Sequence, residues 1–417
     1  MSLTCKVPQL RFREFSGEWE EKKYGEIYSF FSTNSFSRDN LNYENGSVKN
    51  IHYGDIHTKF STIFDIRKEN VPFINNEINL SKIKEENYCL VGDLVIADAS
   101  EDYADIGKTI EITNLDNKKV LAGLHTFLAR PNKFDMALGY MGYSLQNWKI
   151  RKQIMTIAQG TKVLSLSTSR LANVILHLPS KPEQQKIASF LSAVDTKIDQ
   201  LTRKKELLEQ YKKGVMQKIF SQELRFKDDD GSEFPEWDEK SIANCITESK
   251  VKGDTGDKAK KLTVKLWNKG VFAKNEIMNG SENTQYYIRK AGQFIYSKLD
   301  FLNCAFGIIP EDLDGYQSTI DLPCFDFINS TNPIFFLSRV SRKDFYLQFG
   351  EQADGSRKAR RINQNIFLEM PILLPTADEQ TKIANFLSSL DEKLLHVSQQ
   401  LDSTKQFKKA LLQQMFV

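Results

Sequence analysis

A stretch of 43 residues occurs twice in the chain, and both copies carry the spacing of a coiled-coil helix. Residues 178–220 and 374–416 align without a gap and share 17 identical residues, among them Leu-Pro, Glu-Gln, Lys-Ile-Ala and Phe-Leu-Ser. In each copy apolar residues recur at alternating steps of four and three, the heptad pattern of a helix that packs against another helix. The chain therefore contains an internal repeat with two long helices.

The seams of these helices define the residues that should face one another. The apolar seam positions are Ile187, Leu191, Val194, Ile198, Leu201 and Leu208 in the first copy, and Ile383, Leu387, Leu390, Leu394, Val397 and Leu401 in the second. A single helix of this kind is usually an ordinary amphipathic core helix. Each of two in-phase copies needs an apolar partner, however, and the other copy is the most economical one. We therefore expect an antiparallel pair with two globular segments at its opposite ends.

Helix-start signals and a second short repeat indicate the boundaries. Ser180 with Glu183, and Thr376 with Glu379, have the spacing of a capping box. A Leu-Arg-Phe triplet followed by a tryptophan precedes each globular segment. The domains that we predict are an N-terminal segment (1–20), a first globular domain (21–178), a first helix (179–220), a linking segment (221–238), a second globular domain (239–375) and a second helix (376–417).

The two globular segments show the same order of patterns. Each has a glycine turn that leads into an apolar strand, at Gly92 and at Gly292, and later a long helical pattern, at 136–157 and at 334–349. In the first segment we also expect a strand over 49–56. The fold class that follows is α+β: two similar mixed α/β domains, separated by a pair of long antiparallel coiled-coil helices and related by a pseudo-two-fold internal repeat.

Composition sets limits on function without identifying it. The 417 residues have a formal net charge of +3, so an argument for binding nucleic acid has to rest on local patches. The five cysteines are scattered, which is typical of reduced thiols in a cytosolic protein. The N-terminus lacks the apolar region of a signal peptide, and no apolar run is long enough to span a membrane. We expect a cytoplasmic protein without membrane contact.

Local basic and polar stretches are the candidates for contact with DNA. Arg357, Lys358, Arg360 and Arg361 follow Gly355 with no acid among them. A lysine run is usually a solvated surface, but four cations on a short loop repel one another unless a polyanion lies against them, and arginine suits phosphate and guanine. The other candidates are Lys298 in the second domain and Lys162, Ser165, Arg170, His52 and Tyr53 in the first. For His52 the plainer alternative is a loop histidine with no chemical role.

Signatures of catalysis are missing from the sequence. There is no phosphate-binding G-x-x-x-x-G-K-[ST] loop, no G-x-G-x-x-G dinucleotide loop and no Asx-Pro-Pro-aromatic motif of an amino-methyltransferase. The five histidines show no metal-ligand spacing with each other or with cysteine. We predict no catalytic residue and no metal site in this chain, which favours a binding role.

The repeated helix start E-Q-x-K-I-A-x-F-L, the heptad seam and the Leu-Arg-Phe…Trp segments resemble the specificity (S) subunit of Type I restriction–modification enzymes. The resemblance covers nearly the full length. It implies that each globular segment is a target recognition domain and that the chain is a non-catalytic DNA-recognition subunit. The two domains would read the two halves of a split double-stranded DNA target, while the helix pair sets the spacer between them.

The resemblance also implies the partners and where the cofactors belong. Two methyltransferase (M) subunits would dock on the helices, and two restriction and motor (R) subunits would complete a cytoplasmic, DNA-associated prokaryotic complex. S-adenosylmethionine would belong to the methyltransferase partner, and ATP and Mg²⁺ to the motor partner, with no cofactor in this chain. Large side chains off the seam would meet partner helices or pack on the recognition domains: Phe190, Leu207, Tyr211, Phe386 and Phe407.

Two other classes of function are compatible with the same pattern. The first is a protein–protein scaffold with two binding modules on a coiled coil and no nucleic acid. The second is an enzyme with an unrecognised site, for instance a nuclease. Binding of random-sequence DNA separates the scaffold from the DNA-reading subunit, and metal-dependent degradation of DNA by the chain alone would indicate the enzyme.

Overall fold

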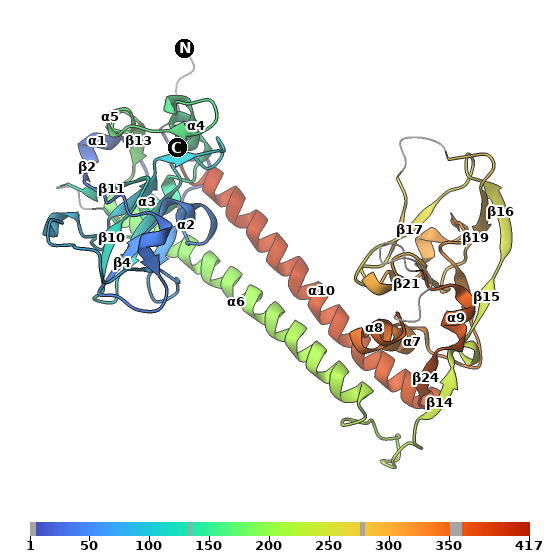
Figure 1. The fold of residues 1–417 in the computed structure, drawn as a ribbon. Coiled ribbons are helices and arrows are strands. Elements are labelled where there is room, and N and C mark those ends of the chain that lie inside the picture. Colours follow the sequence, from blue (N-terminus) through green and yellow to red (C-terminus); the bar gives the residue numbers. More distant parts are fainter. Residues whose placement is uncertain (1–5, 133–135, 276–279, 351–360) are drawn as a thin grey trace. The chain divides into compact units, whose positions relative to one another are not determined.

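The computed structural model describes residues 6–132, 136–275, 280–350 and 361–417. These residues pack into two compact units (Figure 1). Unit 1 consists of residues up to Arg203 together with Ser398–Val417, and unit 2 consists of Lys204–Val397. Each unit therefore combines one globular domain with a part of both long helices. The predicted domain boundaries differ from this division and stay predictions.

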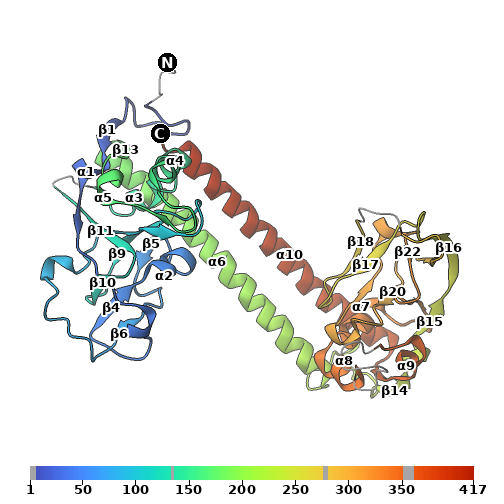
Figure 2. The ribbon, with the colours of Figure 1, turned by 45° about the horizontal axis from the view of Figure 1, so that its top comes forward.

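Unit 1 is built on a five-stranded sheet with the order β2-β11-β7-β9-β5, in which only the β5–β9 pair is parallel. Its strands β5, β9 and β11 are labelled in Figure 2. The strands of this sheet are β2 (Tyr28–Phe31), β5 (Ile63–Asp65), β7 (Leu94–Ala97), β9 (Thr109–Asn114) and β11 (Thr126–Pro131). A second sheet contains β3 (Leu41–Asn42), β4 (Val48–Ile51), β6 (Phe73–Ile74) and β10 (Lys119–Ala122), and two short pairs contain β1 (Glu20–Lys23) with β13 (Ile175–Leu178) and β8 (Ala99–Ser100) with β12 (Leu164–Ser165). The short helices of unit 1 are α1 (Tyr24–Ile27), α2 (Tyr53–Thr58), α3 (Tyr140–Ser144), α4 (Trp148–Ile157) and α5 (Thr168–Leu171).

Unit 2 repeats the central part of this sheet as β15-β23-β20-β21, all antiparallel (Figure 2). These strands are β15 (Ile246–Ser249), β20 (Phe294–Tyr296), β21 (Phe306–Ile308) and β23 (Cys324–Phe327). Smaller sheets contain β16 (Val251–Thr255), β19 (Gln285–Ile288) and β22 (Gln317–Ser318); β17 (Leu262–Val264) and β18 (Val271–Ala273); and β14 (Asp238–Ser241) with β24 (Pro371–Leu374). The short helices of unit 2 are α7 (Pro333–Val340), α8 (Lys343–Gly350) and α9 (Gln364–Glu369).

The two long helices are α6 (Lys181–Phe220) and α10 (Ala377–Gln414). In unit 1 one apolar cluster contains residues from the start of α6 and the end of α10, namely Ile187, Leu191, Val194, Leu411, Leu412 and Met415. In unit 2 another cluster contains the end of α6 and the start of α10, namely Val215, Ile219, Phe220, Ile383, Ala384 and Leu387. In each unit the beginning of one helix lies with the end of the other, which confirms the predicted antiparallel pairing. The predicted seam positions are buried, apart from the half-buried Ile198, Leu208 and Leu394.

Corresponding hydrogen bonds show that the two domains share one scaffold. The turn before the central strand is closed in the same way in both: Leu90 N donates to the Asp93 carboxylate over 2.8 Å, and Lys290 N donates to the Gln293 amide oxygen over 2.8 Å. The strand registers also match, because Val95 faces Leu128 in unit 1 as Ile295 faces Cys324 in unit 2. The predicted repeat of patterns is therefore a repeat of structure.

A buried ion pair explains why both helix starts and both Leu-Arg-Phe triplets recur in the sequence. In unit 1 the Arg11 guanidinium donates from Nε and Nη2 to the two carboxylate oxygens of Glu183, each over 2.8 Å. In unit 2 Arg225 donates in the same way to Glu379, over 3.2 and 2.9 Å. The glutamate side chains are 1% and 0% exposed. The glutamate of the predicted capping box is thus the anchor for the segment that precedes the domain.

The glutamine that follows each of these glutamates makes a second repeated contact. Gln184 donates to the carbonyl of Pro179 over 3.0 Å and accepts from Ala137 N over 3.1 Å. Gln380 donates to the carbonyl of Pro375 over 3.0 Å and accepts from Asn332 N over 3.0 Å. Each Glu-Gln pair therefore ties the first turn of a long helix to the preceding segment and to the helical part of its domain.

Three expectations about local structure need correction. The strand predicted over 49–56 ends at Ile51, because His52 caps α2 by accepting a hydrogen bond from Gly54 N over 3.1 Å. The helix predicted over 136–157 is two helices, since the Asn147 side chain accepts from Lys149 N over 2.9 Å and starts α4 anew. The helix predicted over 334–349 is likewise divided into α7 and α8.

A strand carboxylate caps helix α3 in unit 1. Gly139 and Gly142 donate their backbone N–H groups to the two carboxylate oxygens of Glu111, over 2.6 and 2.7 Å. Burial raises the pKa of Glu111 to about 7, against the opposing effect of these backbone donors. The corresponding residue on β21 is Ile308, and α7 is capped by Asn332 instead. The two domains therefore solve the same capping problem with different residues.

Replacing Arg11 by methionine should lower the free energy of unfolding by about 3 kcal/mol, because the Glu183 carboxylate would stay buried without its cation. The double variant Arg11→Met with Glu183→Met should recover most of this loss, since an apolar pair leaves no unpaired charge. The control is Lys186→Met, which removes the partner of the half-exposed Glu14 on the same segment and should have a much smaller effect. Urea unfolding of the three variants measures this. Equal losses of unfolding free energy for Arg11→Met and Lys186→Met would contradict the anchoring role of the Arg11–Glu183 ion pair.

The raised pKa of Glu111 predicts a pH dependence of stability. Between about pH 4.5 and 7 the folded chain binds the proton of Glu111 while the unfolded chain has released it, so this carboxyl removes stability as the pH rises, by about 3 kcal/mol in total. The pKa of His52, lowered to about 4 by burial, has the opposite effect between pH 4 and 6.5. The contribution of Glu111 to the pH dependence is therefore isolated only by comparing the stability of a Glu111 variant with that of the wild type at each pH.

Relative to the wild type, Glu111→Gln should gain about 2 kcal/mol in the free energy of unfolding as the pH is raised from 5 to 7.5, because the amide cannot ionise. Chemical unfolding at a series of pH values measures the difference. Glu85→Gln, at a carboxylate that is 80% exposed, serves as the control and should track the wild type at every pH. A pH-independent difference for Glu111→Gln would show that this carboxyl does not titrate with a raised pKa.

Candidate nucleic-acid interface

In unit 1 the central strand β7 ends at a charged, partly exposed residue. Asp98 follows β7, and its N–H donates to the carbonyl of His125 over 3.1 Å. The imidazole Nδ1 of His125 lies 3.3 Å from the Asp98 carboxylate, and the two side chains are 51% and 22% exposed. His125 adopts a left-handed backbone conformation with a φ of 53°, which is uncommon for residues other than glycine. Burial raises the pKa of Asp98, against the opposing effect of His125.

The predicted residues His52 and Tyr53 lie beside this pair. The Tyr53 ring contacts the rings of His52, His57 and His125, with centroid distances of 4.7, 5.9 and 5.3 Å. His52 itself is buried and caps α2, so the imidazole ring of His52 is the buried member of this cluster. Tyr53 is half-buried, and its DNA contact stays a prediction. Sequence spacing alone did not indicate that three of the five histidines meet at one tyrosine.

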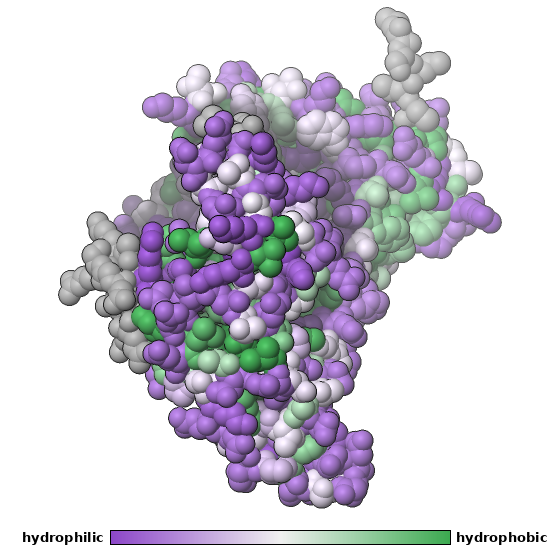
Figure 3. All heavy atoms as spheres, turned by 90° about the vertical axis from the view of Figure 1, so that its right-hand side faces the viewer, coloured by the Kyte–Doolittle hydropathy of each residue, from purple (hydrophilic) through white to green (hydrophobic). Residues whose placement is uncertain are grey.

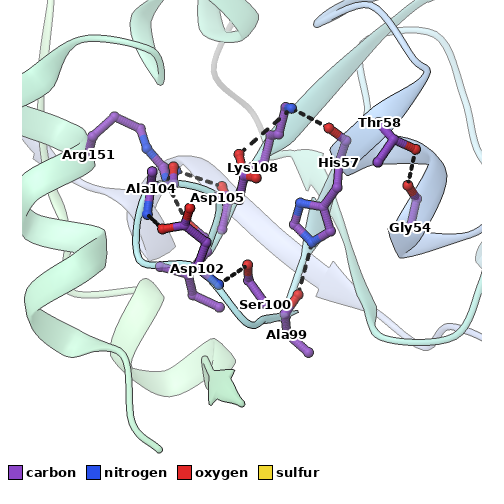
Figure 4. Close-up of polar contacts among 12 residues, drawn as sticks. Gly54, His57, Thr58, Ala99, Ser100, Asp102, Ala104, Asp105, Lys108 and Arg151 are labelled. Carbon is purple, nitrogen blue, oxygen red and sulfur yellow. Dashed lines mark hydrogen bonds and ion pairs between the residues drawn. The ribbon is translucent and has the colours of Figure 1, made fainter. Parts of the chain in front are cut away.

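A network of hydrogen bonds orders the loop that follows Asp98 (Figure 4). His57 Nε2 lies 3.0 Å from the carbonyl of Ala99, and Lys108 Nζ donates to the carbonyl of His57 over 2.6 Å. On the other side of the loop, Arg151 donates to the carbonyls of Ala104 and Gly107 over 3.0 and 3.1 Å. These contacts hold the end of β7 in place from α2 and from α4.

The polar loop around Gly160 joins this region through strand β12. Ser165 pairs with Ala99 of β8, and Leu166 N donates to the carbonyl of Asp98 over 2.8 Å. Ser165 and Lys162 are exposed. Arg170 lies on α5 and donates to the carbonyl of Ile157 over 3.3 Å, a contact that does not connect it to the others. The structure thus brings Lys162 and Ser165 near the Asp98 region by chain connectivity, while Arg170 stays a separate candidate.

In unit 2 the central strand β20 is also followed by a charged residue, the predicted Lys298, two residues after its end at Tyr296. Its N–H donates to the carbonyl of Asp321 over 3.0 Å, and Ile362 N donates to the carbonyl of Lys298 over 3.2 Å. Arg361 lies 3.6 Å from the Asp321 carboxylate. Burial lowers the pKa of Lys298, against the opposing effect of Asp321. Arg357, Lys358 and Arg360 lie outside the described residues, so their contact with DNA stays a prediction.

Sequence reasoning missed a second charged group in unit 1. Arg38 donates to both oxygens of the buried Asp55 carboxylate over 2.6 and 2.8 Å, and Lys59 lies 3.0 Å from it. Lys59 also donates to the Tyr43 hydroxyl over 3.1 Å. Arg38 and Lys59 are 43% and 52% exposed, so both cations reach the surface beside α2. Asp55 and Lys59 have the i,i+4 spacing of neighbours on one helix face, but no local sequence pattern links Arg38 to either of them.

Two features that other kinds of site require are missing from the described residues. Over the described ranges, no three histidine, cysteine, aspartate or glutamate side chains are grouped as ligands for a metal ion. Within the same ranges, no helix has both the length and the apolar composition that a membrane span requires.

Comparison with known proteins agrees with this architecture. Residues 16–210 match the sequence model of the Type I restriction modification DNA specificity domain. The "Putative type I restriction enzyme MjaX specificity subunit" of Methanocaldococcus jannaschii is 25% identical over 244 residues, which cover 55% of this chain and 53% of that protein. This chain therefore matches about half the length of that relative.

Solved structures show the same fold at low sequence identity. The crystal structure of a Type I restriction–modification S subunit from M. genitalium aligns over 99% of both chains with a TM-score of 0.57 and 14% identity. A chain from a structure of a type I R-M system, solved to describe complex assembly and conformational transition, aligns over 94% of this chain and 96% of that chain with a TM-score of 0.51 and 13% identity. The chain is therefore similar in sequence to the Type I restriction modification DNA specificity domain over residues 16–210, and it has the fold of solved Type I specificity subunits over nearly its full length.

Proposed function

We propose that this chain is a specificity subunit of a Type I restriction–modification enzyme and that it reads a split DNA target, with each domain recognising one half. The observation that carries the proposal is that the two domains share one hydrogen-bonded scaffold while corresponding side chains differ in charge. Asp98 and Lys298 occupy the same place after the central strand, and the neighbouring loops are polar in unit 1 and basic at Arg361 in unit 2. One scaffold with two different surfaces suits a protein that reads two different sequences.

The long helices would set the spacer and dock the methyltransferase subunits. Two of the large off-seam residues pack on the chain itself: Phe190 contacts Phe12, and Phe386 contacts Phe226, both with ring centroids 5.7 Å apart. Three others remain about half exposed, namely Leu207, Tyr211 and Phe407. Exposed aromatic and aliphatic side chains on a helix are the usual anchors of a protein interface. Figure 3 shows hydrophobic side chains in separate patches within a mainly hydrophilic face.

The chemistry of the complex would then lie in its partners. This chain would be a non-catalytic DNA-recognition subunit, with S-adenosylmethionine held by two methyltransferase subunits and ATP and Mg²⁺ by two motor subunits. Binding of a pool of random DNA sequences, with the chain alone and with its methyltransferase partner, tests the proposal against a scaffold without DNA affinity. Metal-dependent degradation of DNA by the purified chain would favour a nuclease instead.

Exchange of the first domain should change one half of the target only. We expect that replacing residues 21–178 by the matching segment of another family member alters the half-site read by unit 1 and leaves the other half-site and the spacer unchanged, because each domain has its own core and its own anchoring ion pair. Genome-wide mapping of methylated positions measures this. A change in both half-sites, or a shifted spacer, would contradict separate reading by the two domains.

The length of α6 should set the spacer between the half-sites. The helix is continuous through Arg203 and Lys204, and four residues inserted there add about 6 Å of rise and about 40° of rotation. One base pair adds about 3.4 Å and about 35° of twist. Because a rotational error takes a reading surface off its base edges, whereas slight bending of DNA absorbs a few ångströms, we expect a spacer longer by one base pair.

The same methylation map reads out the insertion. Both half-sites should stay unchanged, and some loss of stability is expected because four residues shift the seam by a stutter. An insertion of seven residues in the same place keeps the heptad phase and serves as the matched comparison. If the active complex keeps its original spacer after the four-residue insertion, the helices do not measure DNA.

A further inference from the structure

The two domains carry opposite charges at one structurally equivalent position. Strand registers place Asp98 and Lys298 at equivalent positions, three residues after the paired Val95 and Ile295 and just beyond the ends of the central strands β7 and β20. The same registers place His125 and Asp321 at equivalent positions, three residues before Leu128 and Cys324 on the partner strand. An acid beside a histidine in unit 1 thus corresponds to a lysine beside an acid in unit 2.

The backbone around this position is fixed identically in both domains, independently of these side chains. The Asp98 N–H donates to the carbonyl of His125 over 3.1 Å, and the Lys298 N–H donates to the carbonyl of Asp321 over 3.0 Å. The Asp98 carbonyl accepts from the N–H of Leu166 over 2.8 Å, and the Lys298 carbonyl accepts from the N–H of Ile362 over 3.2 Å. Backbone atoms alone make these bonds, so the scaffold does not require the charged side chains that this position carries.

The surroundings of the position suit contact with a base. In unit 1 Leu166, the residue after Ser165, donates its N–H to the Asp98 carbonyl. In unit 2 Ile362, the residue after Arg361, donates its N–H to the Lys298 carbonyl. Both positions are therefore adjacent to segments with exposed polar or cationic side chains. The left-handed backbone of His125, which has no steric advantage for a histidine, is the kind of local strain that accompanies functional loops.

We propose that residues 98 and 125 in unit 1, and residues 298 and 321 in unit 2, form one equivalent specificity-determining position that reads a base edge by the charge it carries. The proposal rests on the proposed function, in which each domain reads one half-site. A carboxylate accepts hydrogen bonds from the exocyclic amino group of cytosine, and a lysine ammonium donates to O6 and N7 of guanine. Asp98 therefore selects a base with an amino group in the major groove, and Lys298 selects guanine.

The test uses the full chain in complex with its methyltransferase partner and compares five variants, three at the proposed position and two controls. Asp98→Asn and Lys298→Met remove one charge each with little change in shape. Asp116→Asn and Lys240→Met do the same at residues that are 50% and 48% exposed on the same two units, and they are the matched controls. Target sequences come from maps of methylated positions, and affinities come from titration of DNA in which one base pair at a time is changed.

We expect Asp98→Asn to relax one base position in the half-site of unit 1, and Lys298→Met to relax one base position in the other half-site. Discrimination at that position should fall by about tenfold to a hundredfold, the usual range for one specific base contact. His125→Asn, which keeps a residue that tolerates the left-handed backbone, should relax the same position as Asp98→Asn. The two control variants should keep the original target.

Several outcomes would overturn the proposal. Unchanged discrimination in both Asp98→Asn and Lys298→Met would remove the position from base reading. Equal weakening for all sequences, with a salt dependence lowered by about one, would assign Lys298 to phosphate contact instead. A change in thermal unfolding with no change in preferred base would make the role structural. A wild-type complex without a split target would refute the proposed function itself, and the inference with it.

Discussion

The buried arginine–glutamate pair at the start of each long helix is the contact on which the rest of each unit depends. A carboxylate that is almost fully buried is tolerated only when it is paired and hydrogen-bonded, and Arg11 and Arg225 supply that pairing bidentately. The same arginines hold the segment that leads to a buried tryptophan, since Arg225 also donates to the carbonyl of Pro235 over 2.6 Å. One ion pair thus joins helix, linking segment and domain core.

This anchoring explains how the surface can change while the scaffold stays the same. The turn before the central strand needs one acceptor, and Asp93 and Gln293 both provide it. The partner of that residue then differs: Asp93 binds Arg130 over 2.9 and 2.8 Å, whereas Gln293 donates to Asp326 over 2.7 Å. Helix caps differ too, with Glu111 in one domain and Asn332 in the other. Backbone geometry is retained because each requirement has more than one chemical solution.

The sequence predicted those parts of the fold in which apolar residues recur at a regular spacing. Heptads gave the two long helices and their antiparallel pairing, since the seam positions from Ile187 to Leu401 alternate regularly. Prediction failed where a single side chain overrides a local pattern, as when His52 caps α2 within an apparent strand and Asn147 restarts a helix. The site was predicted only in part. Lys298, Ser165 and Tyr53 lie near the ends of the central strands, but Asp98, His125 and Asp321 carry no motif and become neighbours only through strand register.

A small net charge limits how this protein would bind DNA under the proposed function. Contacts with phosphate supply most of the affinity of DNA-binding proteins and are independent of sequence. With a formal charge of +3 over 417 residues, this chain has little general attraction for a polyanion. Under the proposed function it would therefore need locally placed cations, and Arg361 beside β20 and Arg38 and Lys59 beside α2 are candidates for that role. An acid such as Asp98 near the DNA would then repel phosphate and be acceptable only where a base offers a hydrogen-bond donor. Under the proposed function, a negative charge that weakens non-specific binding would therefore sharpen the difference between right and wrong targets, because specificity is a difference of affinities.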